Sequence, residues 1–160
     1  MSRLRLLDLP ADRMEGEAVA ALFFMDDRPV RGPVALLDWR LNGFLSALLR
    51  EGSISGEAGE QVITPTNGKL GAHWVMFAGG GRWHDLDRVR YRELVRELLK
   101  SCWQAGFSRI ALTLTPLEGM AAEDLQRLVG EALSEAEVGT MECLLSLSGR
   151  ERARELPRAT

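Results

Sequence analysis

The residues with the clearest chemical potential lie in the stretch FAGGGRWHDLD, which spans residues 77–87. Three consecutive glycines, Gly79, Gly80 and Gly81, follow an apolar run and precede a helical pattern. A glycine turn between a strand and a helix often binds phosphate in α/β proteins, because free backbone N–H groups and the helix dipole point at the anion. Arg82 follows the three glycines directly, and its positive charge is compatible with a bound anion. We favour the alternative, a tight turn, because glycine is commonly required at corners with positive φ.

Two tryptophans lie next to glycine-bearing turns. Trp83 follows the triple glycine, and Trp39 follows the segment DDRPVRGP at residues 26–33. Partly exposed indoles there would suit stacking on a base or on a partner surface, and core packing is the competing interpretation. If the corner binds a ligand, the sequence predicts a site formed by Gly79, Gly80, Gly81, Arg82, Trp83, His84, Arg31 and Trp39.

No arrangement of nucleophiles or metal ligands is recognisable in the sequence. His73 and His84 have no clustered cysteine or carboxylate partners, so they do not predict a metal site. Cys102 and Cys143 are far apart and lack metal-type spacing, which predicts reduced thiols in the core. The serines of the loop at residues 52–56 lie in neither a GxSxG elbow nor a triad. We therefore expect no catalytic residue, no metal and no cofactor.

Composition limits the class of protein. The chain has 160 residues, of which 46% are hydrophobic and 27% charged, as expected of one globular domain. A net charge of −3 gives no general attraction to nucleic acid or to an anionic membrane. The N-terminus is too short and too charged for a signal peptide, and no apolar run approaches the roughly 18 residues that span a bilayer. By elimination, we expect a cytoplasmic protein.

Hydrophobic periodicity predicts alternating strands and helices. Period-two or continuous apolar runs indicate strands, and apolar residues spaced by three and four indicate helices. Asn67-Gly68 is a strong hairpin signal, which makes one strand pair antiparallel. The expected strands span residues 4–9, 18–24, 61–64, 72–78, 109–115 and 139–147, and the expected helices span residues 34–50, 86–105 and 121–137. This order predicts a mixed sheet flanked by helices in one domain.

The helical patterns also predict which side chains are buried. In the helix at residues 34–50, we expect Leu41, Phe44, Leu45 and Leu48 to lie in the core. In the helix that follows the triple glycine, the apolar side carries Leu86, Val89, Leu94, Val95, Leu98, Leu99 and Trp103. Asp85 or Asp87 is expected to cap the start of this helix, and Gly106 to end it.

The stretch from residue 36 to residue 81 resembles the N-terminal, non-catalytic domain of the leucyl aminopeptidase family, peptidase family M17. A helix of the type LDxxLxGxLxxLL is matched by Leu37, Asp38, Leu41, Gly43, Leu45, Leu48 and Leu49. A loop of the type GxFxGxxGE is matched by Gly52, Gly56, Gly59 and Glu60, with Ile54 where an aromatic residue is usual. The family's turn between two strands is matched by Pro65, Gly68 and Leu70. Its short glycine turn before the next helix is matched by Gly79 and Gly81.

The resemblance implies a three-layer α/β/α fold with a mixed, mostly parallel sheet, similar to a macro domain. It implies a domain at residues 1–148, and the charged composition of residues 149–160 indicates a tail that follows it. The family's peptidase activity belongs to a separate C-terminal domain with two metal ions and a motif resembling NTDAEGR, and no such residues occur here. We therefore expect a stand-alone, non-catalytic relative that binds an unknown protein partner or associates with itself.

The competing hypothesis is a macro-like binder, or weak hydrolase, of a nucleotide or ADP-ribose. Macro domains hold this ligand with two glycine-rich loops. The first loop region here, at residues 26–39, contains Arg28, Arg31 and Gly32 but no triple glycine. The second pattern is replaced by TPLEGMAAED at residues 115–124. The sequence thus leaves both functions open.

Overall fold

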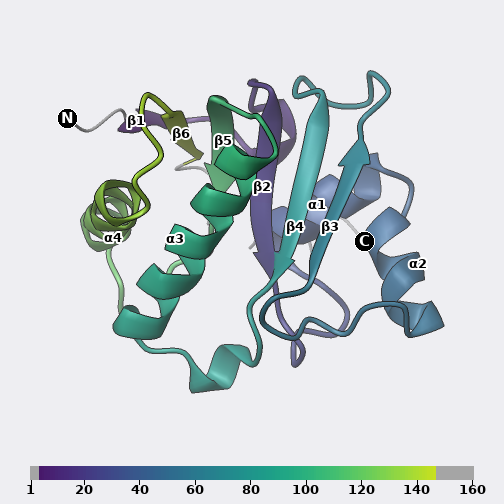
Figure 1. Cartoon of the computed structure of the whole chain (residues 1–160). Coiled ribbons are helices and arrows are strands. Elements are labelled where there is room, and N and C mark those ends of the chain that lie inside the picture. Colours follow the sequence, from purple (N-terminus) through teal and green to yellow (C-terminus); the bar gives the residue numbers. More distant parts are fainter. Residues whose placement is uncertain (1–3, 147–160) are drawn as a thin grey trace.

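The computed structural model describes residues 4–146, which form a six-stranded sheet with helices on both faces (Figure 1). The strand order is β1-β6-β5-β2-β4-β3, and every pair is parallel except β3 with β4. The strands are β1 Leu4–Leu7, β2 Ala18–Phe23, β3 Gln61–Pro65, β4 Trp74–Gly79, β5 Arg109–Thr113 and β6 Glu142–Ser146. The helices are α1 Gly32–Arg40, α2 Phe44–Glu51, α3 Arg88–Gln104 and α4 Ala122–Glu135, with short 3-10 turns η1 Ala11–Arg13 and η2 Trp83–Asp85.

Two hydrophobic cores lie on opposite faces of the sheet. Strand β2 is buried along its whole length and supplies alternate residues to the two cores. Ala20 and Leu22 face the core under α3 and α4, whereas Ala21 and Phe23 face the core under α1 and α2. A strand that is covered on both faces has to be apolar throughout, because successive side chains point to opposite faces. The predicted three-layer α/β/α fold with a mostly parallel sheet is confirmed.

The hairpin signal is confirmed as well. Strands β3 and β4 pair antiparallel, with Ile63 opposite Met76. The turn between them places Asn67 at φ 52° and Gly68 at φ 82°, both in the left-handed region that favours these residue types. The strand predicted at residues 139–147 is observed as β6, and its last predicted residue lies outside the described residues, as does the domain boundary expected after residue 148.

The single helix predicted at residues 34–50 is wrong, because the chain forms two helices that are separated by a tight turn. Asn42 has φ 58° and Gly43 has φ 77°, so neither continues a right-handed helix. The buried carboxylate of Asp38 caps the second helix: Oδ1 accepts from the N–H of Leu45 at 2.7 Å, and Oδ2 accepts from the hydroxyl of Ser46 at 2.6 Å. A carboxylate at a helix start satisfies N–H groups that have no partner within the helix.

The predicted burial of helix side chains is correct only in part. Leu41 and Leu45 are buried as expected, whereas Phe44 and Leu48 are half-buried. On α3, Val89 is 57% exposed and Trp103 is 37% exposed, so their assignment to the core side is wrong.

Helix α3 instead buries an aromatic residue that the pattern did not select. Tyr91 is fully buried, and its hydroxyl donates to the carbonyl of Thr115 at 2.5 Å. That partner satisfies the polar end of the ring, which lets a tyrosine occupy the core. The start of the helix is capped by Asp87, one of the two residues that the sequence offered, whose carboxylate accepts from the N–H of Arg90.

Both cysteines are buried free thiols, in agreement with the sequence. Burial raises the pKa of Cys102 to about 12 and that of Cys143 to about 12, because removal from water disfavours the thiolate. Since the thiolate is the reactive form, these side chains act as apolar core residues.

Candidate functional site

The glycine corner joins β4 to α3, and its backbone N–H groups are already used by the fold. The N–H of Gly79 donates to the carbonyl of Glu60, that of Gly80 to Phe23, and that of Gly81 to Gly56. The three donor–acceptor distances are 2.8, 2.9 and 2.8 Å, which are normal for such bonds. A phosphate at this corner would therefore find these three donors occupied.

Gly79 and Gly80 have to be glycine because neighbouring atoms leave no space for a side chain, and not because of their backbone conformation. A Cβ atom on Gly79 would lie closer than 3.0 Å to the carbonyl oxygen of Glu57, and one on Gly80 equally close to the ring of Phe24. Only Gly81 has a positive φ, at 81°, and a Cβ atom there would meet open space. The corner is thus a tight turn, as we favoured, although positive φ explains just one of its three glycines.

A carboxylate of the chain itself occupies the place where an anion would cap the turn after the glycines. Asp26 Oδ1 accepts from the N–H of Trp83 at 2.7 Å, and Oδ2 accepts from the N–H of His84 at 3.1 Å. Burial alone would raise the pKa of Asp26, but backbone N–H groups, foremost those of Trp83 and His84, together with the charge of His84 hold the pKa below its usual value. His84 Nε2 lies 3.7 Å from the same carboxylate. Asp26 therefore fastens η2 to the loop that follows β2.

A pocket of about 380 Å³ lies beside this contact, at the carboxyl ends of β2 and β5. Three of the predicted site residues line it, namely Arg31, Trp83 and His84, together with Asp26 and Asp27. The indole of Trp83 packs edge-on against Phe24, with ring centroids 5.0 Å apart, and against Tyr91 at 6.1 Å. This is the edge of an α/β sheet at which ligands bind most often.

The charges in the pocket do not favour an anion. Arg31 Nε lies 3.1 Å from Asp27 Oδ1, so its positive charge is paired. The carboxylate of Asp26 is 12% exposed. Sequence reasoning missed both aspartates, although two adjacent carboxylates within four residues of the end of a buried apolar strand were a visible signal.

The other predicted site residues lie elsewhere. Gly79, Gly80, Gly81 and Arg82 form the corner without lining the pocket, and Trp39 is 70% exposed on α1. The guanidinium of Arg82 approaches Asp85 at 3.8 Å in an exposed pair. The structure thus brings three of the eight predicted residues together at the pocket.

We expect Arg82→Ala to change the free energy of unfolding by no more than about 0.5 kcal/mol, because exposed ion pairs contribute little. Urea unfolding of the variant and the unmodified protein measures this. The thermal shift with sulfate and with ADP-ribose should also be the same for both proteins. A ligand-induced shift that disappears in the variant would show that the corner does bind anions.

Within residues 4–146, no group of three or more His, Cys, Asp or Glu side chains is placed to hold a metal ion. In the same part of the chain, no helix is long and apolar enough to cross a bilayer.

Comparison with known proteins finds one family model, described as the cytosol aminopeptidase family, N-terminal domain, which matches residues 21–140. A probable cytosol aminopeptidase of Sulfurihydrogenibium sp. is 27% identical over 101 residues, which cover 63% of this chain and 20% of that protein. One of Persephonella marina is 37% identical over 75 residues, covering 46% of this chain and 15% of the relative. The matched segments are thus a fifth or less of these relatives.

Solved structures with a similar fold include a leucine aminopeptidase and macrodomains. A tomato leucine aminopeptidase mutant has a TM-score of 0.67 at 20% identity, covering 98% of this chain and 35% of that one. A Trypanosoma brucei macrodomain has a TM-score of 0.70 at 17% identity, covering 98% of this chain and 66% of that one. The same macrodomain in complex with ADP-ribose has a TM-score of 0.69 at 17% identity, covering 98% and 68%. At these identities the likeness concerns the fold.

Proposed function

We propose, from the premise that this chain belongs to the cytosol aminopeptidase family, N-terminal domain, that it is a non-catalytic protein-interaction module that associates with itself. The cytoplasmic location remains a prediction from the sequence.

The observation that carries the proposal is the exposure of Trp39. Its neighbours Val34 and Leu37 are buried in the core under α1 and α2, whereas 70% of Trp39 faces solvent. An indole buries roughly 150–250 Å² when it is covered. At about 25 cal/mol per Å², covering the exposed part gives roughly 3 kcal/mol.

The surroundings of Trp39 also suit a contact surface. Leu36, one turn earlier on α1, is half-buried, and Arg40 Nε lies 3.9 Å from Asp12 Oδ2 in a partly exposed pair. A large aromatic residue with a polar rim is the usual composition of an interface anchor.

We expect the purified protein to show concentration-dependent self-association that Trp39→Ala weakens at least about tenfold, the effect of losing 1.4 kcal/mol at an interface. Sedimentation velocity over a concentration series measures the dissociation constant. Val89→Ala, a substitution at another exposed apolar residue, serves as the control. A monomer at every concentration, or equal effects of the two substitutions, would contradict self-association through α1.

We further expect no metal-dependent aminopeptidase turnover by this chain, because two-metal hydrolysis needs several ligands around ions roughly 3.5–4 Å apart. The assay is hydrolysis of a leucine anilide by the purified chain, with and without Mn²⁺ or Zn²⁺. Turnover that a chelator abolishes would overturn this expectation.

A second candidate function is binding of a nucleotide or ADP-ribose, and the observation in its favour is the pocket at the carboxyl ends of β2 and β5. One macrodomain of the same fold was solved in complex with ADP-ribose. A thermal-shift series tests this: ligand at 100 times its dissociation constant stabilises a protein by about 2.7 kcal/mol. A shift with ADP-ribose that Trp83→Ala removes would place this function first, and no shift at millimolar ligand would reject it.

A further inference from the structure

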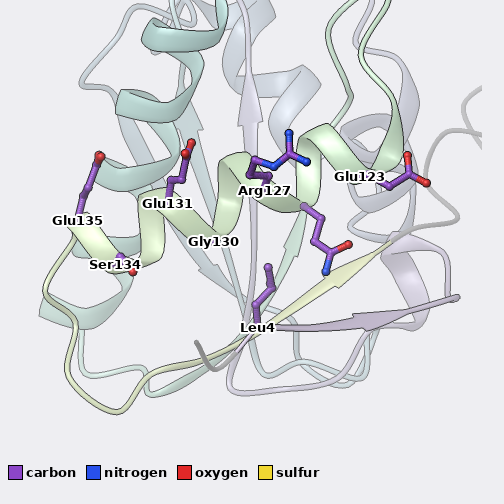
Figure 2. Close-up of a pocket in the computed structure, with 8 residues that line it drawn as sticks. Leu4, Glu123, Arg127, Gly130, Glu131, Ser134 and Glu135 are labelled. Carbon is purple, nitrogen blue, oxygen red and sulfur yellow. The ribbon is translucent and has the colours of Figure 1, made fainter. Parts of the chain in front are cut away.

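The two ends of the sheet present different surfaces. At the β1 end, Leu4 and α4 line a groove of about 670 Å³, and Figure 2 shows charged side chains along the helix. Those charged residues are Glu123, Arg127, Glu131 and Glu135. Charges along one side are typical of a solvated helix face. Strand β3 forms the opposite end of the sheet (Figure 1), and its surface is different in kind.

The surface at the β3 end is apolar. Ile63 of β3 lies opposite Met76 of β4, and Pro65 lies opposite Trp74. Opposite residues of an antiparallel pair point to the same face, and Met76 belongs to the core under α3 and α4. On that face, Ile63 is 44% exposed and Trp74 is 38% exposed. Neighbouring exposed apolar residues of this kind mark a contact surface.

The hydrogen bonds at the two ends of β3 show which backbone groups face β4. The N–H of Gly79 donates to the carbonyl of Glu60 at 2.8 Å, and the N–H of Thr66 donates to the carbonyl of His73 at 2.9 Å. The direction of backbone hydrogen bonds alternates along an antiparallel strand. The even-numbered residues of β3 therefore bond to β4, and the odd-numbered residues direct their backbone groups away from it.

The outer edge of β3 thus carries backbone groups that the fold does not use. Among the described strands, β3 pairs only with β4. The outward N–H groups belong to Gln61 and Ile63, since Pro65 has none. The carbonyls of all three residues also face outward. That of Pro65 has a contact of 3.3 Å with the hydroxyl of Thr64 and keeps a second acceptor position.

We propose that β3 pairs antiparallel with β3 of a second copy of this chain, in a register centred on Ile63. Ile63 then lies opposite Ile63 of the second copy, and Gln61 lies opposite Pro65. Every outward N–H group of both strands meets a carbonyl in this register. A register centred on Thr64 would place Ile63 opposite Pro65 and Gln61 beyond the end of the other strand, so the bonds from Gln61 would be lost.

The side chains match on both faces in the register centred on Ile63. On the α3 side, Met76 and Ile63 of one copy continue into Ile63 and Met76 of the other, which gives one apolar row across four strands. On the α1 side, Val62 lies opposite Thr64 of the second copy. β-branched residues opposite each other stabilise a strand pair.

Charges at the two ends of β3 favour a second copy as the occupant. Glu57 lies six residues before Ile63 and Lys69 six residues after it, and both are exposed. In an antiparallel pair, the start of one strand lies beside the end of the other. Glu57 of each copy therefore approaches Lys69 of the other, as a twofold interface requires. An unrelated strand would not have this matched pair of charges.

The proposal goes beyond the interface at Trp39, because Trp39 belongs to α1 on the opposite face of the sheet. A protomer with two separate twofold interfaces can join more than two copies. The pairing of β3 is therefore best measured in the Trp39→Ala variant, in which the contact at α1 is weakened.

Residue-resolved amide hydrogen exchange in the Trp39→Ala variant tests the pairing. We expect the amides of Gln61 and Ile63 to exchange at least about tenfold more slowly at roughly 1 mM protein than at roughly 10 μM, because pairing gives them acceptors. The amides of Val62 and Thr64, which bond to β4 within one chain, are the internal control. Their exchange should be slow at both concentrations.

Ile63→Lys in the same background identifies the centre of the interface. It sets like charges opposite each other, and lysine on an edge strand blocks pairing. We expect it to raise the dissociation constant of the dimer at least about tenfold in sedimentation velocity. Val89→Lys, the same change at an exposed apolar residue of α3, should leave the dissociation constant unchanged.

Charge reversal tests the register. Glu57→Lys and Lys69→Glu should each weaken the dimer, because each creates a pair of like charges between the copies. The double variant should restore the dissociation constant, since the two charges then exchange places across the interface. A double variant weaker than both single variants would contradict the register centred on Ile63.

The outcomes separate this proposal from the interface at Trp39. If the unmodified protein self-associates while exchange at Ile63 is independent of concentration, the β3 pairing is wrong and the interface at Trp39 stands. If exchange at Ile63 slows with concentration while Trp39→Ala leaves self-association unchanged, the reverse holds. Equal effects of Ile63→Lys and Val89→Lys would also refute the β3 pairing.

Discussion

Gly79→Ala is expected to lower the free energy of unfolding by about 3 kcal/mol or more, the upper range for forcing an extra group into a packed site. The added Cβ atom would lie closer than 3.0 Å to the carbonyl oxygen of Glu57, and a backbone atom cannot turn aside as a flexible side chain can. Moving Glu57 would also disturb the loop in which Glu60 accepts from the N–H of Gly56. Urea unfolding followed by circular dichroism measures the loss.

Gly81→Ala is the matched control for this prediction. Its φ of 81° costs an alanine roughly 1–2 kcal/mol, yet its Cβ atom meets nothing within 4 Å. We therefore expect the Gly81 variant to be clearly more stable than the Gly79 variant. The opposite order would mean that backbone conformation, and not the contact with Glu57, requires glycine at this corner.

Leu45→Ala is expected to cost about 2–5 kcal/mol, the range for removing a large side chain from a packed core. Leu45 is fully buried in the core under α1 and α2. Its backbone N–H, which donates to Asp38, is unchanged in the variant, so the loss isolates the packing of the side chain. Chemical denaturation measures it.

Leu48→Ala on the same helix provides the comparison, because Leu48 is only half-buried. We expect it to cost less than Leu45→Ala, since the loss scales with the apolar area removed from water. A Leu45 variant that loses under about 0.5 kcal/mol would show that α2 does not anchor the sheet through this residue.

The corner also explains why the candidate site was only partly predictable. The triple glycine was visible, and so was its position between a strand and a helix. The partners of its N–H groups were not visible, because Phe23 and Gly56 are distant in the sequence. Asp26 binds the N–H of Trp83, 57 residues away. A contact at such a separation leaves no local pattern, so the sequence left open whether the corner binds an anion.

The break between α1 and α2 is a different case, because part of its signal was local. Asn42-Gly43 is a pair that tolerates left-handed φ, yet the apolar spacing of three and four continues across it. Periodicity therefore favoured one helix. The start of the second helix is stabilised by the buried carboxylate of Asp38, which accepts hydrogen bonds from Leu45 and Ser46.

The sequence by itself determined the order of strands and helices apart from the break between α1 and α2, the antiparallel hairpin at Asn67-Gly68 and the doubly covered strand β2. These features depend on backbone preferences and on hydrophobic periodicity over a few residues, and both are visible in a short stretch of sequence. The tertiary structure alone decided which aromatic residues are exposed, as with Trp103, and which carboxylates cap turns, as with Asp26. Those outcomes depend on which segment packs against which, and burial and hydrogen bonding between distant residues set them only once the sheet has formed.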